Sequence, residues 1–284
     1  MIPFAWSEPS SLSDAVRMLD GGDPSIRPIA GGTALMLMMK TGVFAPSHLV
    51  SLAKIERRYF EIAASPYGGL RIGAMASLAA LERSADVARH FPVMTAALKT
   101  LSNIRVRNVA CVGGALAHGD PHMDLPPLLA ALNARAIITG PKGKRELDIE
   151  DLYAGFYETH LERGELISEV LVPPLTGAHA AFIKVTSRSA DDWPSLSLAA
   201  LLRMDGPRIE AARIVLSAAT EKVTRLVAAE RSLVGATLDD AICAKAGEAA
   251  VNEVSLLSDA HGSAAYKTEL LRVYVGRLLR KALS

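Results

Sequence analysis

Two glycine pairs are the strongest chemical signal in this chain. Gly31-Gly32 lies between a predicted strand and a predicted helix, and Gly113-Gly114 lies in a later run of small residues. Glycine lets the backbone approach a ligand closely, and free amides at the start of a helix favour a phosphate group. One such pair alone is explained as well by an ordinary strand-to-helix turn. Two of them in consecutive small α/β units predict a ligand whose long diphosphate is held between them.

The common nucleotide-binding fingerprints are missing. The chain contains no Gly-x-Gly-x-x-Gly run and no Gly-Lys-Ser/Thr run. An ordinary dinucleotide-binding Rossmann site and a P-loop are therefore unsupported.

Side chains that could bind a metal alternate along residues 118–124. His118, Asp120, His122 and Asp124 would share one side of an extended chain, but a glycine and a proline interrupt any regular strand there. The alternative is that Asp124 alone points inward and hydrogen-bonds a sugar hydroxyl, as acidic residues do in nucleotide sites. We favour this second interpretation.

Lys184 is a charged residue among apolar neighbours in the middle of a predicted strand. Spacing alone favours a solvated face for such a lysine. The alternative is a cation that offsets the negative charge of a bound cofactor.

The elements that must position these residues fall into three regions. In the first, Ser11 caps a predicted helix over residues 12–20, strands are predicted over 27–30 and 49–52, and Thr33 is placed to cap a helix over 34–41. In the second, strands are predicted over 70–74, 135–139 and 165–172, and helices over 78–83 (capped by Ser77), 92–101 and 125–132. Residues 108–120 are too poor in periodicity for an ordinary helix.

The third region has strands followed by helices. Strands are predicted over residues 180–187, 195–204 and 208–218, with a hairpin turn at Asp205-Gly206. Helices are predicted over 222–233, over 238–250 behind a Thr237/Asp240 capping box, and over 264–283. This order predicts a separate α+β domain.

Composition excludes several classes of protein. The 284 residues carry 31 basic and 30 acidic side chains, a net charge of +1, which provides no electrostatic field for nucleic acid or an anionic membrane. Cys111 and Cys243 are too few for a disulfide framework or a self-contained iron–sulfur cluster, and they favour the reducing cytoplasm. The start of the chain does not resemble a signal peptide, and the longest uncharged stretch, residues 170–183, is too short to span a membrane.

Both glycine loops resemble those of a known family. Residues 30–40, AGGTALMLMMK, resemble the first FAD loop of the flavoprotein (medium) subunits of molybdenum hydroxylases. Residues 111–115, CVGGA, followed by HGDP at 118–121 and DLPPL at 124–128, resemble the second loop. The medium subunits of carbon monoxide dehydrogenase are the nearer relatives and the flavin domain of xanthine dehydrogenase is more distant. The resemblance covers essentially the whole chain.

The resemblance implies a fold of the vanillyl-alcohol-oxidase type. Two α+β subdomains, residues 1–57 and 58–177, would hold FAD, and residues 178–284 would form a C-terminal α+β domain with a three-stranded sheet and helices. It also implies non-covalent FAD contacts at a set of residues in both loops and beyond them: Ile29, Ala30, Gly31, Gly32, Thr33, Ala34, Leu35, Cys111, Val112, Gly113, Gly114, Ala115, Asp120, Asp124, Ile167, Lys184 and Trp193.

The resemblance also implies a role for several of these residues. The backbone amides of both loops would bind the FAD diphosphate, Asp124 would contact the adenosine end, and Ile167 would make an apolar contact. Lys184 would lie near the flavin ring, where a cation stabilises the reduced form, and this overturns the solvated-face interpretation. Trp193 stands where carbon monoxide dehydrogenase medium subunits have tyrosine, in a loop over or near the isoalloxazine.

Three residues depart from the family pattern. Ala34 stands where serine or aspartate is common, Cys111 replaces threonine, and Ala115 replaces asparagine. The last two replacements remove side-chain hydrogen bonds to the cofactor, each worth about 1 kcal/mol. We expect weaker FAD binding, or binding that depends on an assembled complex.

The resemblance further implies partner subunits. A large subunit would carry molybdopterin, a small subunit would carry two [2Fe–2S] clusters, and the complex would be a cytoplasmic heterohexamer, a dimer of heterotrimers. Electrons would pass from molybdenum through iron–sulfur to FAD and then to an external acceptor. The alternatives are a free-standing FAD oxidoreductase of the same fold, a scaffold subunit that has lost its flavin, and a metal hydrolase built on residues 118–124.

Overall fold

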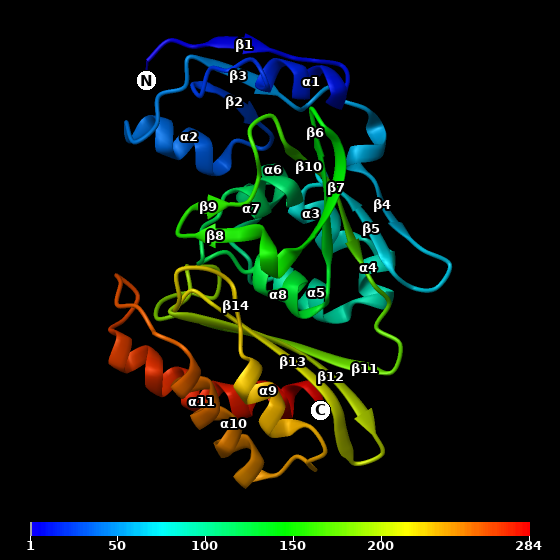
Figure 1. The fold of residues 1–284 in the computed structure, drawn as a ribbon, viewed down its shortest axis with the longest axis vertical. Coiled ribbons are helices and arrows are strands. Elements are labelled where there is room, and N and C mark those ends of the chain that lie inside the picture. The colour runs from blue at the N-terminus through cyan, green and yellow to red at the C-terminus, as the bar shows by residue number, and fades with distance from the viewer. Residues whose placement is uncertain (1) are drawn as a thin grey trace.

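Three sheets follow one another along the long axis of the molecule, from the N-terminal region at one end to the C-terminal region at the other (Figure 1). The computed structural model describes residues 2–284. The sheets fall within the three predicted regions, whose boundaries at 57/58 and 177/178 stay predictions. No helix in the described chain is both long and apolar enough to cross a membrane.

The first region is a small parallel sheet with a helix after each of its first two strands. Strands β1 (Ala5–Ser7), β3 (His48–Ser51) and β2 (Ile26–Ile29) pair in that order. Helix α1 (Leu12–Leu19) begins at Ser11, whose hydroxyl accepts the Asp14 amide at 3.1 Å, as predicted. Helix α2 (Thr33–Lys40) differs from the prediction, because its N-cap is Gly32 and Thr33 is already its first residue. Strand β1 was not predicted.

The second region is an antiparallel sheet covered by short helices. Its strands pair in the order β4 (Ile62–Ala64), β5 (Leu70–Gly73), β10 (Leu166–Val172), β6 (Arg135–Gly140) and β7 (Gly143–Asp148). The helices are α3 (Leu78–Arg83), α4 (Ala85–His90), α5 (Pro92–Leu98), α6 (Ile104–Val109), α7 (Val112–Ala117) and α8 (Leu125–Ala131). Two 3₁₀ turns, η1 (Arg57–Phe60) and η2 (Ile149–Leu152), and the pair β8 (Tyr153–Gly155) and β9 (Glu158–Thr159) complete it.

Helix α7 corrects the prediction that residues 108–120 contain no ordinary helix. The helix is only one and a half turns long, and its first two amides donate to the carbonyls of Ala76 and Ala74 rather than within the helix. Tertiary contacts therefore stabilise a helix whose sequence carries no helical periodicity.

The third region has a four-stranded sheet instead of the predicted three-stranded one. Strands β11 (Ala178–Val185), β12 (Leu196–Asp205), β13 (Arg208–Ser217) and β14 (Thr224–Arg225) are antiparallel neighbours. Because β14 takes the start of the predicted helix, α9 covers only Val227–Leu233. Helix α10 (Asp240–Glu253) is capped by Asp239, not by the predicted Thr237 box, and α11 (Ala264–Ala282) follows.

The C-terminal sheet joins the second and third regions. Leu198 and Leu202 of β12 lie in a core formed with α10 and α11, whereas Ala199 lies in the core of the second region, against which α8 packs. Alternate side chains of one strand thus enter two different cores, as the period of two requires. The sheet therefore packs against α8 on one face and against α10 and α11 on the other.

Candidate functional site

The two glycine loops lie against each other in the folded chain. A Cβ atom at Gly31 would collide with the carbonyl oxygen of Val109, so the first loop touches the backbone that leads into the second. Burial raises the pKa of the Cys111 thiol, and the backbone of Gly31 partly offsets this effect. Cys111 is therefore a buried side chain at the junction of the loops.

Three of the four glycines are required by the protein itself, and Gly114 is not. Gly32 has φ +70°, a left-handed conformation that other residues adopt at a cost. A Cβ at Gly113 would lie 2.7 Å from the Ala74 Cβ, too close for any side chain, whereas one at Gly114 would lie 3.9 Å from the Ala30 Cβ, an ordinary contact. Neither backbone nor packing requires glycine at 114, and this exposed position faces space that a ligand could fill.

The start of α2 offers free amides, as predicted. The first helical hydrogen bond runs from the Met36 amide to the Gly32 carbonyl at 2.9 Å. The amides of residues 32–35 have no acceptor within residues 2–284. Together with the helix dipole they form a place where a phosphate oxygen would be stabilised.

The second loop offers fewer amides than the sequence predicted. The Val112 amide donates to Ala76 at 3.0 Å, the Gly113 amide to Ala74 at 2.7 Å, and the Ala115 amide to Cys111 at 2.9 Å. The prediction that residues 111–115 all bind a diphosphate through their amides is therefore wrong at these three positions. Only the amides of Cys111 and Gly114 remain without an acceptor in the described part of the chain.

Lys184 and Asp124 form a buried ion pair. The Lys184 Nζ lies 2.8 Å from Asp124 Oδ2, and the two side chains are only 6% and 5% exposed. Lys184 also donates to the Thr100 carbonyl at 3.0 Å, and the Ser197 hydroxyl donates to Asp124 Oδ1 at 3.2 Å. Burial raises the pKa of the Asp124 carboxyl, and Lys184 partly offsets this. The solvated-face interpretation of Lys184 is wrong, because strand β11 is covered on the side where this lysine points.

This ion pair makes two predicted roles incompatible. Asp124 was expected at the adenosine end of FAD and Lys184 at its flavin ring. Two groups 2.8 Å apart cannot contact opposite ends of one extended cofactor. The two predicted roles therefore cannot both hold.

Asp120 lies between α7 and α8 with its side chain fully buried. Its Oδ1 accepts the His122 amide at 2.9 Å and lies 3.1 Å from His122 Nδ1, but its Oδ2 has no partner among residues 2–284. Burial alone would raise the pKa of Asp120, but the hydrogen bonds from His122 outweigh it and lower that pKa. A buried carboxylate oxygen without a partner is a ready acceptor for an N–H or O–H of a ligand.

Trp193 is 46% exposed and lies on the ring of His122. The two ring centroids are 5.7 Å apart and the planes differ by 16°, a stacked arrangement, and His261 is tilted against the same indole. The indole of Trp193 is thus at the surface.

The remaining predicted residues divide by burial. Ile29 and Ile167 are buried in apolar cores. Three more positions, Ala34, Leu35 and Ala115, are half-buried, and Thr33 is exposed.

The four alternating residues of 118–124 do not converge on one point. Asp124 turns to Lys184, Asp120 to His122, and the His118 ring packs on Tyr157 with centroids 5.2 Å apart. The described residues hold no group of three or more histidine, cysteine, aspartate or glutamate side chains that could bind a metal.

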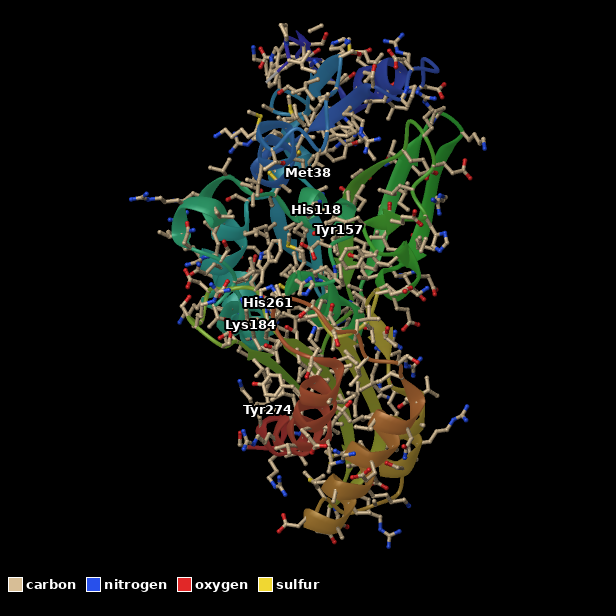
Figure 2. The ribbon with its side chains drawn as sticks, turned by 90° about the vertical axis from the view of Figure 1, so that its left-hand side faces the viewer. Met38, His118, Tyr157, Lys184, His261 and Tyr274 are labelled. Atoms are coloured by element: carbon tan, nitrogen blue, oxygen red, sulfur yellow. The ribbon has the colours of Figure 1, made fainter. Side chains whose placement is uncertain are left out.

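The labelled residues of Figure 2 mark one face shared by all three regions. Met38 of α2, then His118 and Tyr157, then His261 and Lys184 follow one another down this view. A surface cavity of about 340 Å³, lined by charged residues such as Lys142 and Arg145, does not include the glycine loops.

Sequence reasoning missed part of this face. Tyr157 and Asp259 contact residues 118–122 from 38 to 137 positions away in the chain, and no local motif marks them. Tyr157 donates its amide to the Gly119 carbonyl at 3.0 Å, and its pKa is raised to about 12 by burial and by Asp120.

The geometry defines a class of protein. Two glycine loops lie against each other, one in a small parallel α/β unit and the other in the antiparallel region that follows, and a C-terminal α+β domain comes after them. Residues 2–175 match the family described as FAD binding domain in molybdopterin dehydrogenase, and residues 181–282 match the CO dehydrogenase flavoprotein C-terminal domain. The chain belongs to this family, the FAD-binding medium subunits of molybdenum-containing oxidoreductases.

Individual relatives span the whole chain. The carbon monoxide dehydrogenase medium chain of Afipia carboxidovorans is 32% identical and covers 99% of this chain and 98% of its own length. The glyceraldehyde dehydrogenase medium chain of Sulfolobus acidocaldarius is 29% identical over 95% of each chain. A solved carbon monoxide dehydrogenase from Hydrogenophaga pseudoflava superimposes with a TM-score of 0.95 at 31% identity, covering 100% of this chain and 99% of that one. The resemblance seen in the loop sequences is confirmed.

Proposed function

We propose that this chain holds one non-covalent FAD in an extended form along the face marked in Figure 2. The observation that carries this proposal is Gly114: it is exposed, its conformation is helical, and nothing in the protein prevents a side chain there. Close approach of a ligand supplies the missing reason for glycine. The free amides at the start of α2, directly across from it, suit the diphosphate.

The far end of the face suits a ring that gains negative charge. Lys184 has three N–H donors and uses two of them, on Asp124 and Thr100. The third can donate to a ring atom of the cofactor, and the unpartnered Oδ2 of Asp120 can accept from one. When bound, FAD supplies the electron acceptor and donor, while these residues orient it and set the charge around it.

We propose that the electron-transfer partners of this chain are subunits that carry iron–sulfur clusters and molybdopterin. Cys111 and Cys243 are both buried and free, so iron–sulfur clusters must be supplied by another chain. A small [2Fe–2S] subunit and a large molybdopterin subunit, in a dimer of heterotrimers, would complete the path. Free buried thiols also suit a reducing cytoplasm.

The substrate of the complex is open, because it would be chosen on the large subunit. Relatives of nearly equal identity are named for carbon monoxide and for glyceraldehyde. Sequence similarity of this chain therefore does not select between them.

The test uses the full chain, alone and co-expressed with the proposed large and small subunits. We expect visible flavin absorbance with about one FAD per chain, and molybdenum and iron only in the co-purified complex. Flavin with substrate turnover by the chain alone would favour the free-standing oxidoreductase. Assembly without flavin would favour the scaffold alternative.

A further inference from the structure

His122 connects two regions of the chain that are distant in sequence. Its Nδ1 lies 3.1 Å from Oδ1 of Asp120, in the same loop, and its Nε2 lies 2.9 Å from Oδ2 of Asp259, in the loop before α11. The His122 side chain is 9% exposed. Both ring nitrogens therefore face a carboxylate oxygen in a nearly buried site.

The charges around His122 require its protonated form. Asp259 also accepts from Lys267, whose Nζ lies 2.6 Å from Oδ2 and whose side chain is fully buried. Two carboxylates and one ammonium leave one net negative charge, which an imidazolium cancels. Only an imidazolium has an N–H on both nitrogens to donate to both carboxylates. The nearby Lys184–Asp124 pair adds no net charge.

Other titratable groups around His122 do not change this result. The ring of His261 lies 5.3 Å from that of His122 between centroids. Burial lowers the pKa of His118 despite the neighbouring Asp120, so His118 is neutral. For His122 itself, burial would lower the pKa, but the hydrogen bonds to Asp120 and Asp259 outweigh it and raise that pKa.

The indole of Trp193 is stacked on the ring of His122. Its indole is parallel to the His122 ring, with 5.7 Å between centroids, and it is otherwise nearly half exposed. A cation against an aromatic face is attracted by the negative charge of the ring face. A surface indole stacked on a ring fixed from both sides has its own orientation fixed.

We propose that His122, held between Asp120 and Asp259, is the positioning residue that fixes the indole of Trp193 beside the flavin end of the site. The placement of flavin rests on the proposed function, whereas the contact between His122 and Trp193 does not. His122 does not touch the reacting atoms; it acts through Trp193. When pH rises through the raised pKa of His122, one N–H is lost, one carboxylate contact becomes repulsive, and Trp193 is released.

Nuclear magnetic resonance of the full chain tests the positioning directly. The chain has seven histidines and only two tryptophans, so Trp6 is an internal control for Trp193. With ¹⁵N-labelled histidine and tryptophan, we expect one imidazole protonated on both nitrogens near neutral pH, with a titration above that of an ordinary histidine. The indole N–H signal of Trp193 should shift with the same pKa, and that of Trp6 should not.

Three variants assign the effect. His122→Gln should abolish the titration of the Trp193 signal. Asp259→Asn should lower the pKa with which this signal titrates by about one unit. His261→Gln is the matched control, because it removes the other ring beside Trp193 and leaves both carboxylate contacts of His122 intact. The proposal is overturned if the Trp193 signal does not titrate with the pKa of the His122 ring. It is also overturned if the Trp193 signal still shows the same titration in His122→Gln.

A second measurement reads the flavin. The FAD-loaded chain, reduced with dithionite and mixed with aerated buffer, should reoxidise with a pH step in the wild type that is lost in His122→Gln. An unchanged step would contradict positioning at the flavin. If the chain retains no FAD, the proposed function fails, and the resonance experiment still decides whether His122 holds Trp193.

Discussion

At the scale of single residues, the pair of Lys184 and Asp124 shows how burial determines what a charged side chain does. Both side chains are almost fully covered, and each satisfies the other at 2.8 Å. Removing one partner from a buried ion pair leaves an uncompensated charge, whereas removing both leaves an apolar site. Single and double substitutions of Lys184 and Asp124 can therefore separate their role in stability from their role in ligand binding.

We predict that Lys184→Met and Asp124→Leu each lower the free energy of unfolding by about 3–5 kcal/mol, and that the double variant recovers much of this loss. Urea unfolding of the three variants at neutral pH, without added FAD, measures it. Simple addition of the two losses would contradict the coupling. If Lys184 also contacts the flavin, the stable double variant should still bind FAD more weakly than the wild type. Because no metal is involved in this pair, a chelator should leave the FAD content of the protein unchanged.

At the scale of elements, α7 lies beside the start of α2, and the two neighbouring glycines of α7 have different surroundings. Gly113 lies against Ala74, so its Cβ position is taken by protein, and Gly114 next to it faces free space. Substitutions at these two adjacent positions should therefore affect different properties of the protein. The first should act on folding and the second on ligand binding.

We predict that Gly114→Ala leaves the chain as stable as the wild type, or more stable by up to about 1 kcal/mol through helix propensity, and weakens FAD binding about tenfold or more. Gly114→Val should abolish flavin retention. Gly113→Ala is the matched control and should lower stability by about 1–3 kcal/mol through overpacking. FAD titration and thermal unfolding measure both properties, and a folded Gly114→Val chain with full flavin content would remove the loop from the site.

At the scale of the whole molecule, Asp259 links the C-terminal domain to the loop between α7 and α8. Burial would raise the pKa of Asp259, but the hydrogen bonds from Lys267 and His122 outweigh it and lower that pKa to about 2. A depressed folded pKa contributes stability above the unfolded pKa of the carboxyl, and this stability is lost as pH falls from about 4 to about 2.

We predict that Asp259→Asn lowers the free energy of unfolding at pH 7 by up to about 2 kcal/mol, and that the difference from the wild type disappears as pH falls from about 4 to about 2. Urea unfolding at a series of pH values, with both proteins in the same buffers, measures the difference directly. A constant difference across this range would show that Asp259 contributes through packing and not through its charge.

A further prediction at this scale concerns the assembled complex. Trp193→Ala should leave FAD bound and leave its reduction by the molybdenum and iron–sulfur subunits nearly unchanged, but it should change the rate of reoxidation. The reason is that the indole is half exposed and lies on His122 rather than in a core. Stopped-flow reduction and reoxidation separate the two rates. Unchanged reoxidation with a large loss of thermal stability would make Trp193 a structural residue.

The sequence alone determined the class of the protein. Strong local signals, such as Ser11 before α1, Ser77 before α3 and the Asp205-Gly206 turn, fixed elements where backbone and side chain agree locally. The two glycine loops and their spacing identified the family. These features could be predicted because each depends on residues close together in the chain.

The tertiary structure decided the rest. Helix α7 exists because the backbone carbonyls of Ala74 and Ala76, more than 35 positions earlier, accept its first hydrogen bonds, and no local periodicity predicts it. Strand β14 exists because it pairs with β13. Only the fold brought Lys184 to Asp124, 60 positions away, and Asp259 to His122, 137 positions away. A charged side chain is exposed or buried according to what covers it, and in this chain the covering residues come from other elements. The physical role of each candidate residue was therefore set by packing between regions.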